Sequence, residues 1–250
     1  MLEKGKISSF QMAVVMYPTI FSTAILLLPR ISSKHAAQDL WLSPIWASAA
    51  GFLAVFLMYR LHRLYPQQTL IEHCERILGP VVGKVLGFAY LFYFLHITAI
   101  ILREYGEFVV GTFLRLTPMI IVMVGMVFAA MTTVRGGIEV LGRTAEIFGP
   151  IVTILIIIII LLLLPELNPE YVLPVMDRGI TPSLKGAVTP MIWFSEFWLV
   201  SFFFPFLADP KRGLRWAMTT VLVVMISMTV TNLITLMVFG TLMEHLTFPV

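Results

Sequence analysis

The first apolar stretch of the chain contains residues 17–30, which read YPTIFSTAILLLPR. It belongs to an apolar run of about twenty residues, the length that a helix needs to cross a bilayer. Pro18 interrupts this run, because it has no amide hydrogen for the carbonyl of Val14 and costs about 3 kcal/mol inside a helix. Lipid offers no replacement donor, so a broken backbone is tolerated at this depth only where protein or a water-filled cavity satisfies it.

Hydroxyl side chains follow this proline. Thr19, Ser22 and Thr23 supply hydrogen-bonding groups at the depth where the backbone lacks one. The middle of the segment is therefore a candidate binding site built on an interrupted helix. The alternative is a kinked structural helix, since proline, serine and threonine also occur in ordinary membrane helices, where they adjust the backbone locally.

The composition extends this interpretation to the whole chain. Hydrophobic residues make up 59% of the 250 residues and charged residues 12%, and the mean hydropathy is +0.94, whereas a soluble domain carries about 25% charged residues. These values predict an integral membrane protein. The net charge of +3 comes from side chains that lie mainly between the apolar runs, so it reports topology and excludes nucleic acid as a partner. The chain has one cysteine, so no disulfide forms within it.

Seven segments are long and apolar enough to span a bilayer. We expect an all-α membrane protein with one domain over residues 1–250, whose spans lie at 9–29, 43–61, 83–102, 118–134, 146–164, 184–207 and 216–239.

Lysine and arginine predict the orientation of these spans, because cytoplasmic loops carry an excess of both. With the N-terminus inside, the inner side holds eleven of the 17: Lys4, Lys6, Arg60, Arg63, Arg76, Lys84, Arg135, Arg143, Lys211, Arg212 and Arg215. The outer side holds the other six: Arg30, Lys34, Arg103, Arg115, Arg178 and Lys185. The N-terminus is therefore expected to be inside.

The sixth span contains a second irregularity. It includes the sequence TPMIWFSEFWLVSFFFP, in which Pro190 and Pro205 bracket Ser195 and Glu196. Glu196 lies about twelve residues, or roughly 18 Å of helical rise, into the span and thus near the middle of the membrane. A carboxylate at that depth is costly and is by default a functional hypothesis; the alternative is a hydrogen-bonded Glu196 that locks helices together. Interrupted helices at the first and sixth positions are typical of transporters built from inverted repeats, which bind substrate between them.

The third span contributes an aromatic face. Tyr93 lies about ten residues, or roughly 15 Å, from Gly83 and thus near the midplane, and Tyr90 and Ile97 share its side of the helix. A phenol at that depth needs a partner, so Tyr93 is a candidate wall of the site. An ordinary interface tyrosine is the alternative. We interpret His96 as a packed or hydrogen-bonded core histidine, and a proton relay is the alternative.

Several stretches carry a resemblance to one family. They are STAILLLPR, YFLHITAIILREYGEFV, GIEVLGRTAEIFGPI, FSE, FFFPFLADPKR and the terminal LTFPV. Over the whole chain they resemble the B subunit of GerA-type spore germinant receptors, the endospore germination permease family of the amino acid, polyamine and organocation superfamily. Members of that family usually have glycine where Ser22 and Ser195 stand.

The resemblance implies a LeuT-type inverted-repeat fold of about ten helices. The chain resembles the first seven of these, so we expect it to be truncated at the C-terminus. It also implies a small nutrient germinant, expected to be an amino acid, bound between helices one, three and six. The residues that match this site are Thr19, Ser22, Thr23, Ala24, Tyr93, Ile97, Phe194, Ser195 and Glu196. A- and C-type receptor subunits are the implied partners, the spore inner membrane is the implied location, and no metal or cofactor is implied.

Three functions remain open. The first is the germinant-binding receptor subunit, which signals to its partner subunits. The second is an amino acid transporter in which the same pocket opens alternately to both sides, and the third is a structural membrane subunit with a vestigial pocket. An enzyme is not expected, because the sequence has no H-E-x-x-H, no G-x-S-x-G and no cysteine cluster.

Overall fold

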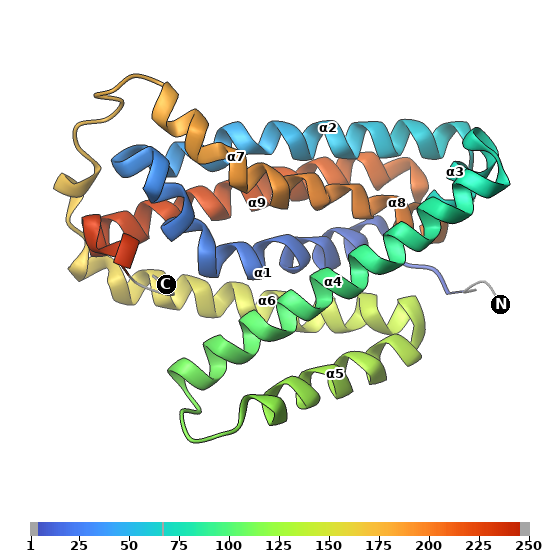
Figure 1. The fold of residues 1–250 in the computed structure, drawn as a ribbon, viewed down its shortest axis with the longest axis horizontal. Helices are drawn as coiled ribbons and strands as arrows, with labels where there is room; N and C mark the ends of the chain where they lie inside the picture. Colours follow the sequence, from blue (N-terminus) through green and yellow to red (C-terminus); the bar gives the residue numbers. More distant parts are fainter. Residues whose placement is uncertain (1–4, 67, 246–250) are drawn as a thin grey trace.

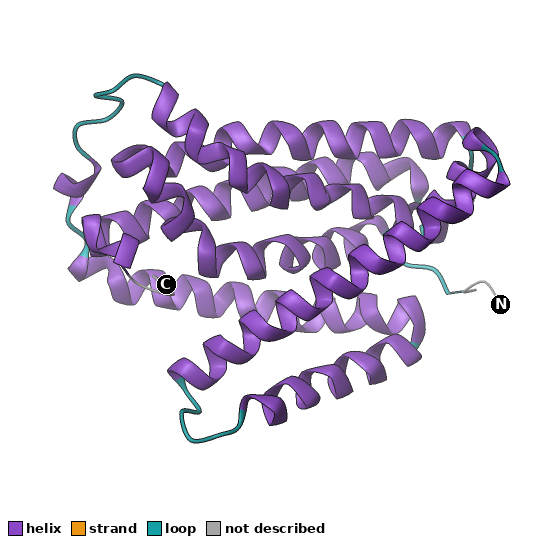
Figure 2. Cartoon of the chain, viewed as in Figure 1, coloured by secondary structure: helices purple, strands orange, loops and turns teal. Residues whose placement is uncertain are grey.

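The computed structural model describes residues 5–66 and 68–245 of the chain. These residues form helices joined by loops (Figure 2), which confirms the expected all-helical class. The terminal stretch LTFPV, which contributed to the family resemblance, lies outside the described residues.

The long helices follow one another along the chain with short 3-10 segments between some of them. The α-helices are α1 (Ser9–Ala36), α2 (Ser43–Leu64), α3 (Leu70–Leu78), α4 (Pro80–Thr112), α5 (Met119–Arg135), α6 (Gly137–Leu163), α7 (Thr181–Ser195), α8 (Val200–Phe203) and α9 (Pro210–Phe239). The 3-10 segments are η1 (Ala37–Leu42), η2 (Leu164–Glu166), η3 (Pro169–Val172), η4 (Glu196–Leu199), η5 (Phe204–Phe206) and η6 (Gly240–His245).

Five helical stretches in the described part of the chain are long and apolar enough to cross a membrane, which agrees with an integral membrane protein. The stretches are Ser9–Leu64, Pro80–Thr112, Gly137–Glu166, Thr181–Phe206 and Pro210–Phe239. The first contains both α1 and α2, which run in opposite directions (Figure 1). Helix α5 is apolar but shorter, with 17 residues.

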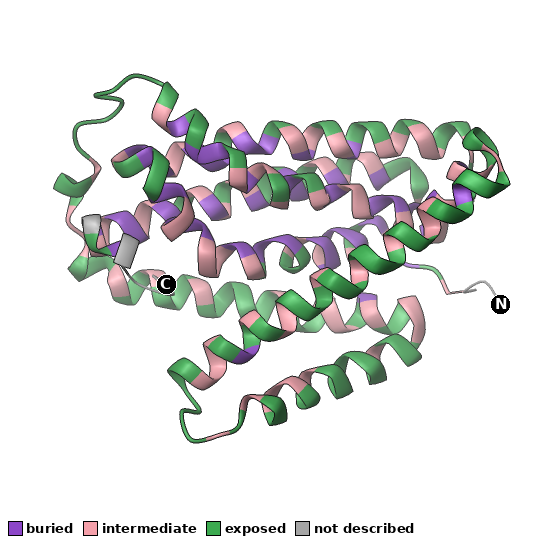
Figure 3. Cartoon of the chain, viewed as in Figure 1, coloured by how far each residue is buried: buried purple, intermediate pink, exposed green. Residues whose placement is uncertain are grey.

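Four of the helices, α1, α2, α7 and α9, form the core (Figures 1 and 3). Helix α1 packs extensively against α7 and α9, and α2 packs against the same two helices. Among the described residues, neither α1 with α2 nor α7 with α9 forms such a contact. If α1 is exchanged with α7 and α2 with α9, the same pairs of helices are in contact as before. Helices α1 and α9 run toward the end of the molecule that holds η6, and α2 and α7 run away from it (Figure 1).

Polar side chains join the core helices. The hydroxyl of Ser43 donates to the carbonyl of Ser183 (3.1 Å), and the indole Nε1 of Trp46 donates to the hydroxyl of the same serine (3.2 Å). These bonds fix the start of α2 against the start of α7. Gly186 permits the close approach of this part of α7, because a Cβ atom there would lie 2.6 Å from the Ser43 hydroxyl oxygen.

The segment before α1 is fixed at the end of the molecule away from the starts of α2 and α7. The amide of Ile7 donates to the carbonyl of Phe206 (3.0 Å), and the amide of Ala208 donates back to the carbonyl of Ile7 (2.8 Å). The amide of Ser9, at the start of α1, donates to Asp209 Oδ1 (2.6 Å). The start of α1 is thus fixed to the linker that precedes α9.

Helices α4, α5 and α6 form a second region beside this core (Figure 1). Helix α4 packs against α3 and α5, and α6 packs against α1 and α5. Most of their side chains are exposed (Figure 3), and α5 has no buried residue. In a membrane protein, exposed apolar faces of this kind contact lipid or other helices.

Candidate functional site

The sixth apolar segment stays helical from Thr181 to Phe206 but changes from α-helix to 3-10 helix at Ser195 and Glu196, and we call this change the interruption. The α-helical part of α7 ends at Ser195, and η4 begins at the next residue. The amide of Glu196 bonds to the carbonyl of Trp193, three residues earlier, as in a 3-10 helix. The carbonyl of Ile192, which an α-helix would have paired with that amide, instead accepts the Ser195 hydroxyl (2.6 Å). Serine at this position therefore replaces a lost backbone hydrogen bond.

Pro190 creates a second free carbonyl in α7. It has no amide hydrogen for the carbonyl of Gly186, four residues earlier. The hydroxyl of Ser32, from α1, donates to that carbonyl at 3.4 Å in a fully buried environment. A neighbouring helix thus satisfies the backbone that proline leaves open, as a membrane interior requires.

Helix α1 does not have the expected interruption. It is a continuous α-helix from Ser9 to Ala36 with Pro18 and Pro29 inside it, so the expectation of a broken first helix is wrong. The physical reason is local. Pro18 is exposed, while Met16 and Ile20 next to it are fully buried and keep the backbone packed against the core.

The hydroxyl residues of α1 have separate roles. Thr19 Oγ1 donates to the carbonyl of Val15 in its own helix (2.8 Å), and Ser22 is exposed. Thr23 Oγ1 accepts a hydrogen bond from Trp193 Nε1 (3.1 Å), which joins α1 to α7 two residues before Ser195. Thr23 is therefore the member of this group that the structure connects to the interruption in the sixth segment.

A cavity of about 500 Å³ lies between α4 and the interruption. Helix α4 contributes Leu86, Ala89, Tyr90 and Tyr93, and the sixth segment contributes Ile192, Ser195 and Trp198. The volume is within the range of small-molecule sites, about 300–1,000 Å³.

Trp198 is the centre of an aromatic cluster at this cavity. Its ring centroid lies 5.2 Å from that of Tyr90 and 6.0 Å from that of Tyr93. Phe94 of α4 and Phe202 of α8 also lie against it, at 5.7 Å each. These spacings are typical of attractive aromatic pairs, so the cluster fixes α4 beside the interruption.

The structure brings only part of the expected site together. Tyr93 and Ser195 line the same cavity, and Glu196 follows Ser195 as the first residue of η4 without lining it. Ala24 and Phe194 are fully buried in the core. Four further residues of the expected site are not among the described residues that line this cavity: Thr19, Ser22, Thr23 and Ile97.

Sequence reasoning missed Trp193 and Trp198, although a signal for one of them was present. Ile192, Ser195 and Trp198 follow one another at intervals of three residues, which places them on one side of a helix. An aromatic residue one turn after the candidate serine was thus predictable as a wall of the same cavity. Trp193 had no comparable signal, because its partner lies on another helix.

The described residues contain no cluster of three or more His, Cys, Asp or Glu side chains that could hold a metal ion. What the cavity offers is a hydroxyl, two phenols and an indole. Such a set can bind a small molecule through hydrogen bonds and aromatic contact.

The fold defines a multi-pass membrane protein with an interrupted helix beside an aromatic-lined cavity. The chain belongs to the spore germination protein family, the spore permeases, whose model matches residues 6–250. This match confirms the resemblance found in the sequence. The matched family is one of germination proteins and not of enzymes.

Curated relatives support the same assignment. Spore germination protein KB of Bacillus subtilis (strain 168) is 29% identical over 214 residues, which are 84% of this chain and 57% of that protein. Spore germination protein YndE of the same organism is 23% identical over 84% of this chain and 58% of its own length. Spore germination protein B2, also from that organism, is 24% identical over 83% and 56%, respectively. The chain thus spans somewhat more than half the length of these relatives. No solved structure matches it with statistical significance.

Proposed function

We propose that the chain acts in a B-type membrane subunit of a spore germinant receptor and binds a small nutrient germinant in the cavity between α4 and the interrupted sixth segment. The observation that carries this proposal is the cavity itself, where Ser195 at the end of an α-helix meets Tyr93 and Trp198. Transporters with inverted repeats bind substrate where their helices are irregular at membrane depth, and the change from α-helix to 3-10 helix is the irregular backbone at this position.

The chemistry of the cavity fits an amino acid. The Ser195 hydroxyl and the Tyr93 phenol provide hydrogen-bonding groups, and the Trp198 indole provides an aromatic face. An ammonium group is attracted to such a face, and an apolar side chain packs on it.

The core packing supports the inverted-repeat architecture that this function presupposes. Exchanging α1 and α2 for α7 and α9 leaves the packing pattern unchanged, and α1 and α7 run in opposite directions (Figure 1). An internal two-fold axis in the membrane plane produces both features. We therefore propose a LeuT-type arrangement in which these four helices are the paired elements of the two repeats.

The orientation and the partners belong to the same proposal. With the N-terminus inside, the start of α1 and the linker before α9 face the cytoplasmic side of the spore inner membrane. A- and C-type receptor subunits are the proposed partners, to which occupancy of the cavity is transmitted. The family assignment and the relatives' names as germination proteins support this role.

The test uses spores that produce the protein together with its partner subunits. Ser195→Leu places a larger side chain at the cavity wall and is expected to abolish the germination response to an amino acid panel, measured as the fall in optical density. Ser22→Leu is the matched control, because Ser22 is exposed on α1 and does not line this cavity. It is expected to respond as the parent does. Immunoblots establish that both variants reach the membrane.

Three outcomes would contradict this proposal. A normal response in Ser195→Leu would exclude the cavity as the germinant site. Loss of response in both variants would favour the wider site expected from the sequence, with α1 as one wall. Uptake of labelled amino acids into vesicles would identify the protein as a transporter and not a receptor subunit.

A further inference from the structure

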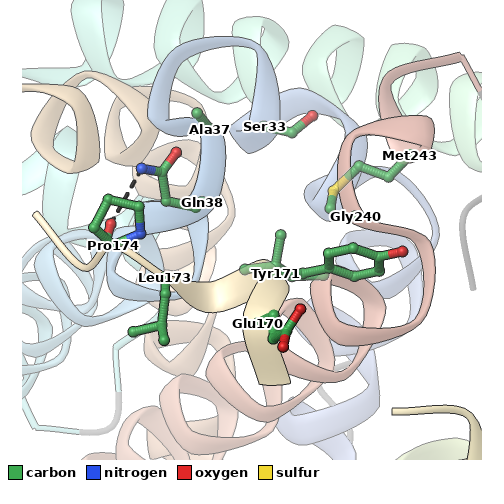
Figure 4. Close-up of a pocket in the computed structure, with 10 residues that line it drawn as sticks. Ser33, Ala37, Gln38, Glu170, Tyr171, Leu173, Pro174, Gly240 and Met243 are labelled. Atoms are coloured by element: carbon green, nitrogen blue, oxygen red, sulfur yellow. Dashed lines mark hydrogen bonds between the residues drawn. The ribbon is translucent and has the colours of Figure 1, made fainter. Parts of the chain in front are cut away.

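A second cavity, of about 310 Å³, lies where the end of α1, the linker between α6 and α7 and the end of α9 meet (Figure 4). Three parts of the chain that are distant in sequence enclose it. The end of α1 with η1 provides Ser33, Ala37 and Gln38, the linker between α6 and α7 provides Glu170, Tyr171, Leu173 and Pro174, and the end of α9 with η6 provides Leu236, Gly240 and Met243.

Hydrogen bonds fix the linker that forms one wall. The amide of Asn168 donates to the carbonyl of Met237 on α9 (2.8 Å). The amide of Met176 donates to Oδ1 of Asp39, a carboxylate that is only 2% exposed. Gln38 Nε2 donates to the carbonyl of Pro174 (3.1 Å), as Figure 4 shows. The cavity is therefore held by bonds on both sides of η3 and does not depend on loose loop packing.

Tyr171 lies directly against Gly240. A Cβ atom on this glycine would be 3.2 Å from the tyrosine ring, and its φ of +53° is one that other residues rarely adopt. Figure 4 shows the ring below Gly240 with Glu170 beside it. Close contact with Gly240 thus positions the ring, while Glu170, the preceding residue, lines the cavity with an exposed side chain.

The polar lining consists mainly of acceptors. Glu170 is the one charged residue among the described residues that line the cavity, and no ion pair to it is found in the described part of the chain. Gln38 uses one Nε2 hydrogen for Pro174, which leaves its Oε1 as an acceptor and its second Nε2 hydrogen as a donor. Ser33 donates its hydroxyl hydrogen to the carbonyl of Arg30 (2.9 Å), so its oxygen can only accept from a ligand.

The rest of the lining is apolar or aromatic. Leu173, Leu236 and Met243 form apolar walls, and the ring of Tyr171 offers a face that attracts cations. A negative group, several acceptors and an apolar floor together select a ligand with an ammonium group and an apolar body. The geometry points to a binding site for a small organic ammonium ion in this end cavity, separate from the germinant cavity between α4 and α7.

The experiment compares two probes that differ in charge. The purified chain in lipid nanodiscs is titrated with 2-phenylethylammonium and with 2-phenylethanol, and binding is followed by ligand-observed NMR. The ammonium ion is expected to bind at least about tenfold more tightly, a ratio that one charge-assisted contact can supply. Equal affinities, or no binding of the ammonium ion up to about 10 mM, the weak limit of specific recognition, would overturn the proposal.

Two variants locate the site. Glu170→Gln keeps the side-chain shape and removes the charge, so the affinity for the ammonium ion is expected to fall about tenfold, to that of the alcohol. Glu166→Gln is the matched control, since this exposed glutamate lies on the same linker but does not line the cavity. It is expected to bind as the parent does. Equal losses in both variants would show non-specific attraction to the linker and contradict the site. Circular dichroism checks the fold, and the two-probe comparison on the parent stands without any variant.

Discussion

The helices α4, α5 and α6 are more apolar than the core helices α1, α2, α7 and α9, yet they are much less buried. Helix α1 has thirteen buried residues, whereas α5 has none and the buried residues of α4 are Gly83 and Gly106. In a membrane, lipid is as apolar as a leucine side chain, so this difference reports packing and not hydrophobicity. Packing between helices fixes the core, and the second region depends more on its surroundings.

The candidate germinant cavity lies where these two regions meet. Ser195 comes from a core helix, while Tyr93 comes from α4 in the second region. A ligand that contacts both walls would therefore change how α4 is held against the core. This is the kind of differential contact by which a ligand shifts the balance between two conformations.

The largest expected effect comes from removing a core side chain. Phe194 is fully buried, so Phe194→Ala should lower the free energy of unfolding by about 3–5 kcal/mol. Phe92→Ala on α4 is the matched control, because that ring is 68% exposed. Denaturation of the purified chain in detergent, followed by circular dichroism, measures both. Similar losses in the two variants would remove the distinction between the regions.

The next effect comes from overfilling a contact between helices. A Cβ atom on Gly51 of α2 would lie 3.0 Å from the Phe194 ring and 3.1 Å from Val221. Gly51→Val should therefore destabilise the core by about 1–3 kcal/mol. Gly125 on α5 has no neighbouring atom within 4 Å of such a Cβ, so Gly125→Val should leave stability unchanged or slightly higher. A stable Gly51→Val protein would show that α2 does not pack closely against α7 and α9.

The sequence predicted the class of the protein and one local feature well. Composition alone indicated an all-helical membrane protein, because few charges and long apolar runs leave no soluble alternative. The α-helical part of α7 ends at the Ser195 and Glu196 pair that the sixth span singled out, since proline and hydroxyl residues change backbone hydrogen bonding locally. Local chemistry of this kind can be read from neighbouring residues.

What the sequence could not supply depends on contacts between distant segments. Pro18 and Pro190 look alike in sequence, but α1 remains continuous, whereas the α-helical part of α7 ends five residues after Pro190. The bond from Ser32 to Gly186 and the cavity at Glu170 likewise require segments more than one hundred residues apart. Hydropathy reports where a helix lies in the chain, but it does not report which face meets which neighbour.

The smallest expected effect tests the link between the core and the interruption. Trp193 Nε1 donates to Thr23 Oγ1 at 3.1 Å, so Trp193→Phe and Thr23→Val should each cost about 0.5–1.5 kcal/mol of stability. Hydrogen bonds between membrane helices average about 0.6 kcal/mol in double-mutant cycles. The double variant should therefore lose less than the sum of the single losses by about that amount. Additive losses would mean that the two side chains are neighbours without a stabilising bond, and that packing alone holds α1 beside the interruption.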